Sequence, residues 1–483
     1  MSLVKDTAIY GMSSIVGRFL NYLLVPLYTH VISAASGGYG VVTNLYAYTA
    51  LILVFLTFGM ETTFFRFANK EGEDAKTVFS TSLALVSALA MVFLTGVWLA
   101  LTPLCTAMGY AQHPDYVLMM AAVVTLDAIQ AIPFSYLRYE HKALKFAGLK
   151  LLFIILNIGL NLYYFLYLGH TDVWGVFALN LVCTSLITFF FLPELWQIRR
   201  WPDMRLMRRM LSYSWPIVIL GVAGILNQAF DKMIFPWAYT RTGLHTQTEA
   251  EVQLGIYGAC VKVAMIMAMI TQAFRYAYEP IVFAKSKDQD SKAYYATAMK
   301  FFLIFTLFAF ICVIGYMDIL KLIVGAEYRE GLGVIPIVMV AEIMMGVYFN
   351  LSFWYKLIDQ TIWGAVFSLA GCAVLIAVNI LLIPQYGYMA CAWGGVAGYG
   401  TAMVLSYLVG QRKNRIDYPM TSIVVYVALT YCVYLLMEQV PEQWPLWARL
   451  GINTLLILAF VAHIIRYDLP LRSLPVIGKY FRK

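Results

Sequence analysis

The chain has 483 residues, of which 61% are hydrophobic and only 12% are charged, and its formal net charge is +8. A soluble protein of this length carries about twice that charged fraction, so the composition excludes a soluble globular enzyme. It indicates an all-α polytopic membrane protein, and the positive charge is expected to follow membrane topology rather than nucleic-acid binding.

Apolar segments of about 20 residues, each long enough to cross ~30 Å of hydrocarbon, recur along the whole chain. The first has no small-residue cleavage site after it, so we expect a retained helix and no cleaved signal peptide. Together they predict about fourteen transmembrane helices, near residues 8–31, 39–65, 78–102, 116–137, 148–168, 173–196, 211–238, 252–278, 297–317, 333–354, 361–383, 387–409, 419–437 and 446–465.

Lysine and arginine predict the orientation of these helices. If the N-terminus is cytoplasmic, 26 of the 34 basic residues fall in inner loops and tails, against three in outer loops. Since basic residues accumulate on the cytoplasmic side, both termini are expected there. The longest outer connections, 239–251 and 318–332, are too short for an extramembrane catalytic domain, and 239–251 shows no clear structure.

An internal repeat relates the two halves of the chain. A shift of 218 residues places Tyr39-Gly40 on Tyr257-Gly258, Glu61 on Glu279 and Arg138 on Lys356. The first helix matches the seventh at a shift of 210, with Pro26 on Pro236. We therefore predict a six-helix lobe at 1–200, a second at 211–412, two further helices at 418–466 and a cytoplasmic tail at 467–483. Two lobes of equal orientation predict a parallel repeat and alternating access by rocking.

Two cations lie at a depth where exposure to lipid would be energetically unfavourable. Arg18 and Lys262 are each about ten residues into a helix, hence ~15 Å deep, and intramembrane charges are functional candidates by default. The repeat pairs Lys262 with Asn44 and Arg18 with Gln228, so each pair holds one cation and one amide. We expect a cavity between the lobes with a cation on each wall, suited to a diphosphate.

Helical periodicity places further polar residues on the same faces as these cations. The candidate substrate-binding residues of the central cavity are Arg18, Asn21, Asn44, Gln228, Asp231, Lys262 and Gln272. The candidate gating or coupling residues are Glu61, Asp127, Glu279 and Glu342.

Structural roles compete with these assignments. Arg18 and Lys262 could instead form ion pairs with a buried acid, namely Asp127, Asp231 or Glu342. Glu61 and Glu279 share a repeat position, which fits a clasp at the inner helix ends as well as a gating or proton role.

We expect structural rather than functional roles for two tyrosines and for the cysteines. Tyr110 and Tyr328 also share a repeat position, and we expect them to be anchors at the membrane interface. The seven cysteines are scattered through apolar spans without a CxxC or metal-binding spacing, so unpaired thiols are expected.

No enzyme active site is predicted. The sequence contains no Walker motif, its six histidines are dispersed, and no Ser-His-Asp or paired-acid spacing is present. No cofactor or metal is expected, which leaves a proton or sodium gradient as the candidate driving force.

Four segments carry a resemblance to a known family: KDTAIYGMSSIVGRFLNYLLVPLYTHVIS, FGMETTFFRFANK, LKLIVGAEYREG and NILLIPQYGYMACAWGGVAGYG. In this order and spacing they resemble the polysaccharide-transport branch of the multidrug/oligosaccharidyl-lipid/polysaccharide exporter superfamily, the Wzx-type flippases. The resemblance covers nearly the whole chain. It implies a V-shaped, MATE-like bundle with a cavity lined by the first, second, seventh and eighth helices.

The resemblance also implies a substrate, an undecaprenyl-diphosphate-linked oligosaccharide repeat unit that is moved from the inner to the outer leaflet for surface polysaccharide. Expected partners are this glycan, membrane lipids, a glycan polymerase and chain-length proteins, with no nucleic acid, and the expected location is the bacterial cytoplasmic membrane. The first helix departs from the drug exporters of the superfamily, because it has Arg18 where they commonly rely on an acid. A cation-coupled multidrug antiporter and a membrane-embedded glycan polymerase remain the alternatives.

Overall fold

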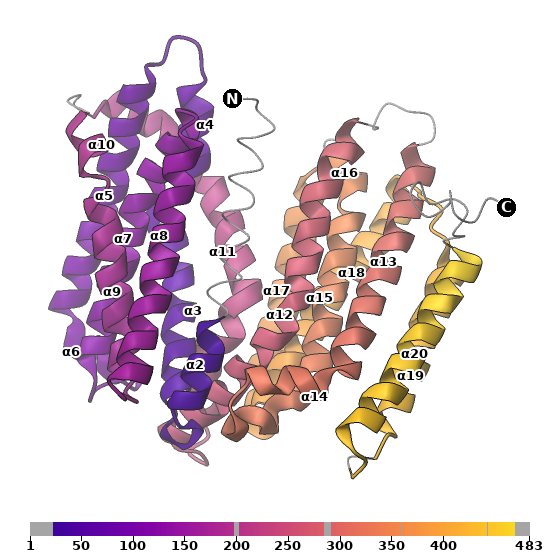
Figure 1. The fold of residues 1–483 in the computed structure, drawn as a ribbon. Helices are drawn as coiled ribbons and strands as arrows, with labels where there is room; N and C mark the ends of the chain where they lie inside the picture. Colours follow the sequence, from indigo (N-terminus) through magenta and orange to yellow (C-terminus); the bar gives the residue numbers. More distant parts are fainter. Residues whose placement is uncertain (1–22, 198–201, 285–290, 359, 442, 469–483) are drawn as a thin grey trace. The chain divides into compact units, whose positions relative to one another are not determined.

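The structure, a computed structural model, describes residues 23–197, 202–284, 291–358, 360–441 and 443–468. Every regular element in these residues is a helix (Figure 1). Twelve helical segments of the described residues are long and apolar enough to cross a membrane, which confirms the all-α polytopic class. The predicted count of fourteen is not confirmed: residues 8–22 lie outside the described residues, and the helix over 387–409 is not among the twelve.

The chain divides into two compact units. The first comprises Met1–Ala259 and Asn379–Cys391, and the second comprises Cys260–Val378 and Ala392–Lys483. The boundaries fall inside three helices, α12 (Gln247–Ala284), α17 (Ile362–Tyr386) and α18 (Tyr388–Lys413). The seventh predicted span therefore groups by contacts with the helices that precede it.

The first unit is a bundle in which α7 and α3 pack against most of the other long helices. Its core gathers Leu56, Met60, Phe64, Phe79 and Ile132, all nearly inaccessible. Asp74 caps α5 and Asp203 caps α11 by accepting hydrogen bonds from first-turn amides, a common way to start a helix. The helices of this unit before α12 are α2 (Leu24–Val31), α3 (Gly38–Thr57), α4 (Met60–Ala68), α5 (Ala75–Leu99), α6 (Leu101–Met108), α7 (Pro114–Tyr139), α8 (Ala143–Leu162), α9 (Trp174–Phe189), α10 (Leu192–Gln197) and α11 (Met204–Thr240).

The second unit surrounds an aromatic core that includes Tyr278, Phe353, Trp354 and Phe367. The second unit contains the parts of α12, α17 and α18 that fall within its boundaries. Its other helices are α13 (Ser291–Gly315), α14 (Met317–Leu320), α15 (Val334–Leu351), α16 (Phe353–Leu357), α19 (Met420–Glu438) and α20 (Leu446–Tyr467). Two 3-10 helices, Lys321–Ile323 and Ala326–Gly333, complete the connection between α14 and α15.

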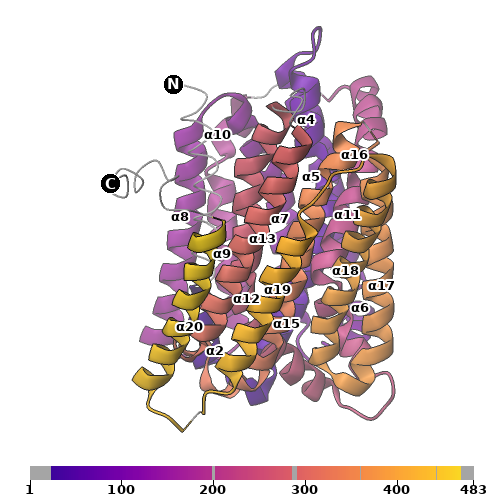
Figure 2. The same cartoon turned by 90° about the vertical axis from the view of Figure 1, so that its right-hand side faces the viewer.

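The last two helices dock on α13, and Figure 2 shows α13, α19 and α20 side by side. Polar contacts secure both ends of α20. At one end Arg449 pairs with Asp318 at 2.6 Å, and at the other Lys300 of α13 pairs with Asp468. Between them Asn453 donates to the carbonyl of Gly315 at 2.8 Å.

Two segments differ in detail from the expectation. The predicted span 39–65 corresponds to one candidate membrane span, Gly38–Ala68, which Phe58 (φ 48°) and Gly59 (φ 65°) divide into α3 and α4 because both adopt left-handed conformations. The outer connection expected over 239–251 is shorter, since α11 continues to Thr240 and α12 begins at Gln247.

Helices α3 and α12 cross with almost no space between them. A Cβ atom added to Gly40 would lie 1.8 Å from the carbonyl oxygen of Glu251, and one added to Gly258 would lie 2.4 Å from Oγ1 of Thr43. Gly40 and Gly258 are the repeat-related glycines of the two Tyr-Gly pairs. Small residues allow such close backbone approach, which is the main source of helix association in lipid.

We predict that Gly40→Ala lowers the stability of the folded protein by about 1–3 kcal/mol, because the added methyl group overpacks the crossing. Gly96→Ala in α5 is the matched control, since nothing lies within 4 Å of its added Cβ. A thermal-unfolding assay in detergent should show a lower midpoint for Gly40→Ala and an unchanged or higher one for Gly96→Ala. Equal midpoints would contradict the close crossing.

Candidate functional site

A proline inside α11 determines the arrangement of the polar residues around it. Pro236 has no amide hydrogen, so the carbonyl of Lys232, four residues earlier, has no helical donor. The side chain of Asn44 on α3 supplies one, with Nδ2 at 2.7 Å from that carbonyl and 3.2 Å from the carbonyl of Met233. The Tyr48 hydroxyl adds a donor to Met233 at 3.1 Å. Helix α3 thus supplies hydrogen-bond donors to two backbone carbonyls of α11.

Tyr110 holds the Asn44 amide in place. Its hydroxyl donates to Oδ1 of Asn44 at 2.8 Å, and Asn44 is only 2% exposed. Both sides of the amide are therefore used within the first unit, which gives Asn44 a structural role there. The expectation that Tyr110 and Tyr328 are interface anchors was wrong, because these residues are 4% and 1% exposed.

A charged cluster lies next to the hydrogen bonds that Asn44 makes with α11. The Lys232 ammonium is 3.0 and 2.9 Å from the two carboxylate oxygens of Asp231, and the Tyr257 hydroxyl donates to the same carboxylate at 2.7 Å. The ammonium also contacts the carbonyl of Gln228 at 3.2 Å. Asp231 is buried, and pairing within the cluster offsets the cost of placing a charge there. Gln228 itself is exposed on α11.

The structure thus brings three predicted site residues, Asn44, Gln228 and Asp231, to Lys232 in the first unit. Lys262 and Gln272 lie on the part of α12 that belongs to the second unit, and both are partly exposed. Arg18 and Asn21 lie outside the described residues. For Glu279 only its place in α12 is described.

The coupling candidates of the first unit share a network of charges. Arg138 of α7 pairs with Glu61 of α4 at 3.1 Å and also donates to the Ser135 hydroxyl at 3.0 Å. Lys150 of α8 interacts electrostatically with both Asp127 and Glu61. Glu61 and Asp127, which lie on different helices, are therefore both within the electrostatic influence of one cation, Lys150. Glu342 lies on α15 in the second unit and is partly buried.

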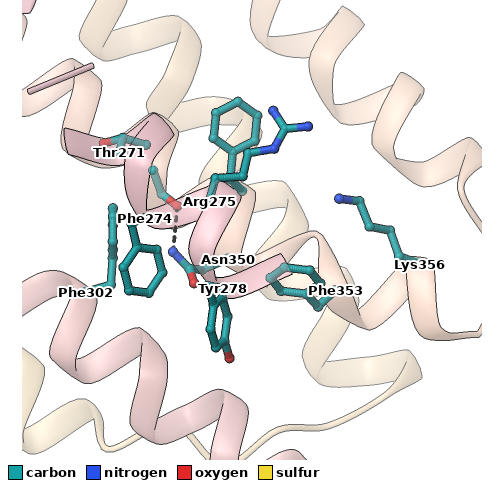
Figure 3. Close-up of a pocket in the computed structure, with 10 residues that line it drawn as sticks. Thr271, Phe274, Arg275, Tyr278, Phe302, Asn350, Phe353 and Lys356 are labelled. Atoms are coloured by element: carbon teal, nitrogen blue, oxygen red, sulfur yellow. Dashed lines mark hydrogen bonds between the residues drawn. The ribbon is translucent and has the colours of Figure 1, made fainter. Parts of the chain in front are cut away.

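A small pocket lies inside the second unit, where α12 packs against α15 and α16, and its mostly apolar wall includes a few polar side chains (Figure 3). It has a volume of about 10 Å³, close to the room that one water molecule needs. The hydroxyls of Thr271 and Tyr278 are buried and have no hydrogen-bond partner among the described residues. Arg275 and Lys356 extend to the same side of the pocket from different helices.

The same position in the first unit is apolar. The shift of 218 residues places Thr271, Tyr278 and Asn350 on Leu53, Met60 and Ile132, which pack in the first unit's core. Only the cation is kept, as Lys356 falls on Arg138. The two repeats therefore differ in polarity at this depth, and a comparison of aligned repeat positions would have found the pocket residues.

Metal chemistry finds no support in the described part of the chain, where no group of three or more His, Cys, Asp or Glu residues could hold an ion. All seven cysteines are free, as expected.

Solved structures of similar fold identify the class of protein. The lipid II flippase MurJ in an inward closed conformation matches with a TM-score of 0.73 and 15% identity, over 96% of this chain and 99% of that one. An inward-facing multidrug resistance MATE transporter of the MOP superfamily matches at 0.63 and 14% identity, over 85% and 95%. The MATE multidrug transporter DinF-BH matches at 0.60 and 15% identity, over 86% and 97%. No curated protein sequence matches significantly.

These likenesses and the twelve spans define a polytopic membrane protein with the fold of MurJ and of the MATE transporters of the MOP superfamily. The family model described as "Polysaccharide biosynthesis protein" matches residues 3–277, more than half of the chain. The chain belongs to this polysaccharide biosynthesis family.

Sequence reasoning missed several residues of the first-unit cluster. Tyr48, Lys232 and Tyr257 were not assigned to the site, although Pro236 was noted as a repeat position. A proline in an apolar span is the available signal, because it requires an outside donor four residues earlier. Spacing along one helix does not identify which helix provides that donor.

We predict that Asn44→Ala destabilises the protein by about 1–3 kcal/mol, because it leaves the Lys232 carbonyl buried without a donor. In a Pro236→Ala background residue 236 regains an amide hydrogen, so the same change should cost at least ~1 kcal/mol less. Thermal unfolding of the two single variants and the double variant measures this coupling. Additive effects would show that Asn44 does not compensate for Pro236.

Charge reversal separates the two roles left open for Glu61. Glu61→Arg and Arg138→Glu should each lower stability, by up to about 1 kcal/mol because the pair is half exposed, and the swapped double variant should recover it. If Glu61 serves only as a clasp, transport by the double variant recovers as well. If Glu61 itself takes part in gating or coupling, stability returns and transport does not.

Proposed function

We propose that this chain is a flippase that moves undecaprenyl-diphosphate-linked oligosaccharide repeat units from the inner to the outer leaflet by alternating access, for O-antigen, capsule or exopolysaccharide biosynthesis. Membership of the polysaccharide biosynthesis family supports this role. So does a fold similar to that of a protein described as a lipid II flippase. The corresponding location is the bacterial cytoplasmic membrane, with both termini in the cytoplasm.

The observation that carries the proposal is the position of Lys262. Helix α12 has 38 residues, and Lys262 lies within four residues, or ~6 Å, of its midpoint in an otherwise apolar stretch. Its side chain is partly exposed at the level where a diphosphate would pass. A cation retained at this depth favours an anionic cargo over a cationic drug. Arg18 is proposed as the second cation of the same path.

The energy source and the partner proteins are part of the proposal. We infer that a proton or sodium gradient drives the cycle, with Glu61, Asp127, Glu279 and Glu342 as the coupling candidates. The lipid-linked glycan is the substrate, and a glycan polymerase and chain-length proteins are the partners downstream. The competing function is a cation-coupled multidrug antiporter, which the likeness to MATE transporters favours. A membrane-embedded polymerase has no comparable support.

The test is complementation of a bacterial strain that lacks its own lipid-linked glycan flippase. We expect Lys262→Ala to lower surface glycan about tenfold or more, because a contact between a charged donor and phosphate is worth roughly 1.5–3 kcal/mol. Lys262→Arg should retain most of the export, since it keeps the cation. Arg18→Ala should act in the same direction.

Lys76→Ala is the matched control, because Lys76 is an exposed lysine in the first turn of α5. Membrane levels of each variant and resistance to cationic drugs are measured in parallel. Full export by the Arg18→Ala/Lys262→Ala double variant would overturn the diphosphate path. Lost drug resistance with normal surface glycan would favour the antiporter.

A further inference from the structure

The start of α11 carries more positive charge than the described residues around it neutralise. A groove of about 560 Å³ is lined there by Asp203, Arg205, Arg208, Arg209 and Ser212. The Asp203 carboxylate is already used, because it accepts the amides of Arg205 and Leu206 as the helix cap. It is therefore a weak partner for the guanidinium groups beside it.

The two sides of α11 differ in how their cations are paired. On the side facing α4 and α5, Arg209 pairs with Glu73 at 2.7 Å, and Tyr213 receives the guanidinium of Arg66 at 4.1 Å from its ring. On the other side, the side chains of Arg205 and Arg208 make no ion pair or hydrogen bond with any residue that the structure describes. The groove therefore presents two guanidinium groups whose charge the bundle leaves uncompensated.

The length of α11 places this groove in the headgroup layer. Its 37 residues extend for ~55 Å, whereas the hydrocarbon core of a bilayer is ~30 Å thick. The first turns of the helix therefore project beyond the hydrocarbon. Guanidinium groups at that level meet the phosphates of the surrounding lipids, and they bind phosphate oxygens in a two-pronged geometry.

Along the exposed face of α11, the side chains change in the same order as the parts of a phospholipid, from headgroup to acyl chain. At 100° per residue, Arg205, Arg208, Ser212, Trp215 and Ile219 fall within an arc of about 80°. Trp215 and Ile219 are 55% and 48% exposed. Along ~21 Å the face thus passes from cations to a hydroxyl, then to an indole, then to an aliphatic side chain. Indole rings prefer the membrane interface, and aliphatic side chains prefer the acyl region.

We propose that this groove is a binding site for one anionic phospholipid, with its phosphate between Arg205 and Arg208, its glycerol region near Ser212 and Trp215, and its acyl chain along Ile219. The site is distinct from the path proposed for the transported glycan. It depends neither on that function nor on Lys262.

The test measures binding of phosphatidylglycerol to the purified full-length protein by native mass spectrometry, with phosphatidylcholine as the zwitterionic reference. We expect a preference for phosphatidylglycerol. In the Arg205→Gln/Arg208→Gln variant its apparent affinity should fall roughly 30-fold, given the usual contribution of an arginine near an anionic surface. Arg412→Gln/Lys413→Gln removes the same charge at the exposed end of α18 and should leave binding unchanged.

Three outcomes would overturn the proposal. One is equal binding of the two lipids, and another is unchanged binding by the Arg205→Gln/Arg208→Gln variant. The third is displacement of phosphatidylglycerol by inorganic pyrophosphate or farnesyl diphosphate at lower concentration, which would assign the groove to free phosphate or to the isoprenoid substrate. Because the readout is lipid binding, a failed export assay leaves this result unaffected.

Discussion

The need to satisfy every backbone polar group inside a lipid bilayer governs the first unit. Pro236 removes one donor from α11, and α3 replaces it through Asn44 and Tyr48. Tyr110 fixes the amide that makes the repair. The residue whose carbonyl is repaired, Lys232, also carries the ammonium that neutralises Asp231. One missing amide hydrogen therefore joins α3, α11 and the loop before α7, and it positions the buried charge pair beside them.

The two repeats use the same helices for different purposes. In the first unit, aliphatic and aromatic side chains close the space between α4 and α7, and Glu61 and Arg138 lie at its edge. In the second unit, hydroxyls, an amide and two cations lie among phenyl rings at the positions that the 218-residue shift pairs with it. The helices at these positions are alike in length and apolarity, while their polar side chains differ.

Much of the architecture follows from one-dimensional features. Span length, the distribution of basic residues and the 218-residue repeat predicted the polytopic class and nearly all of the helical segments. Asn44 was predicted as a substrate-binding residue of the cavity, and its hydrogen-bond partners on α11 were not predicted, because spacing does not identify tertiary neighbours. The break at Phe58 was missed for a similar reason. An uninterrupted apolar sequence predicts one continuous helix, even where tertiary packing gives single residues a left-handed conformation. Tyr110 was misplaced because composition alone does not separate an interface ring from a buried hydroxyl that has a partner.

The break between α3 and α4 sets where this part of the chain leaves the hydrocarbon. Helix α3 has 20 residues and is therefore ~30 Å long, which equals the thickness of the hydrocarbon core. The two left-handed residues that follow thus fall at the depth where water first becomes available to backbone carbonyls. A change of direction that would be prohibitive at mid-membrane is inexpensive there. Helix α4, with Arg66 in its last turn, consequently starts a new helical segment that buries Met60 and Phe64 against α5 and α7.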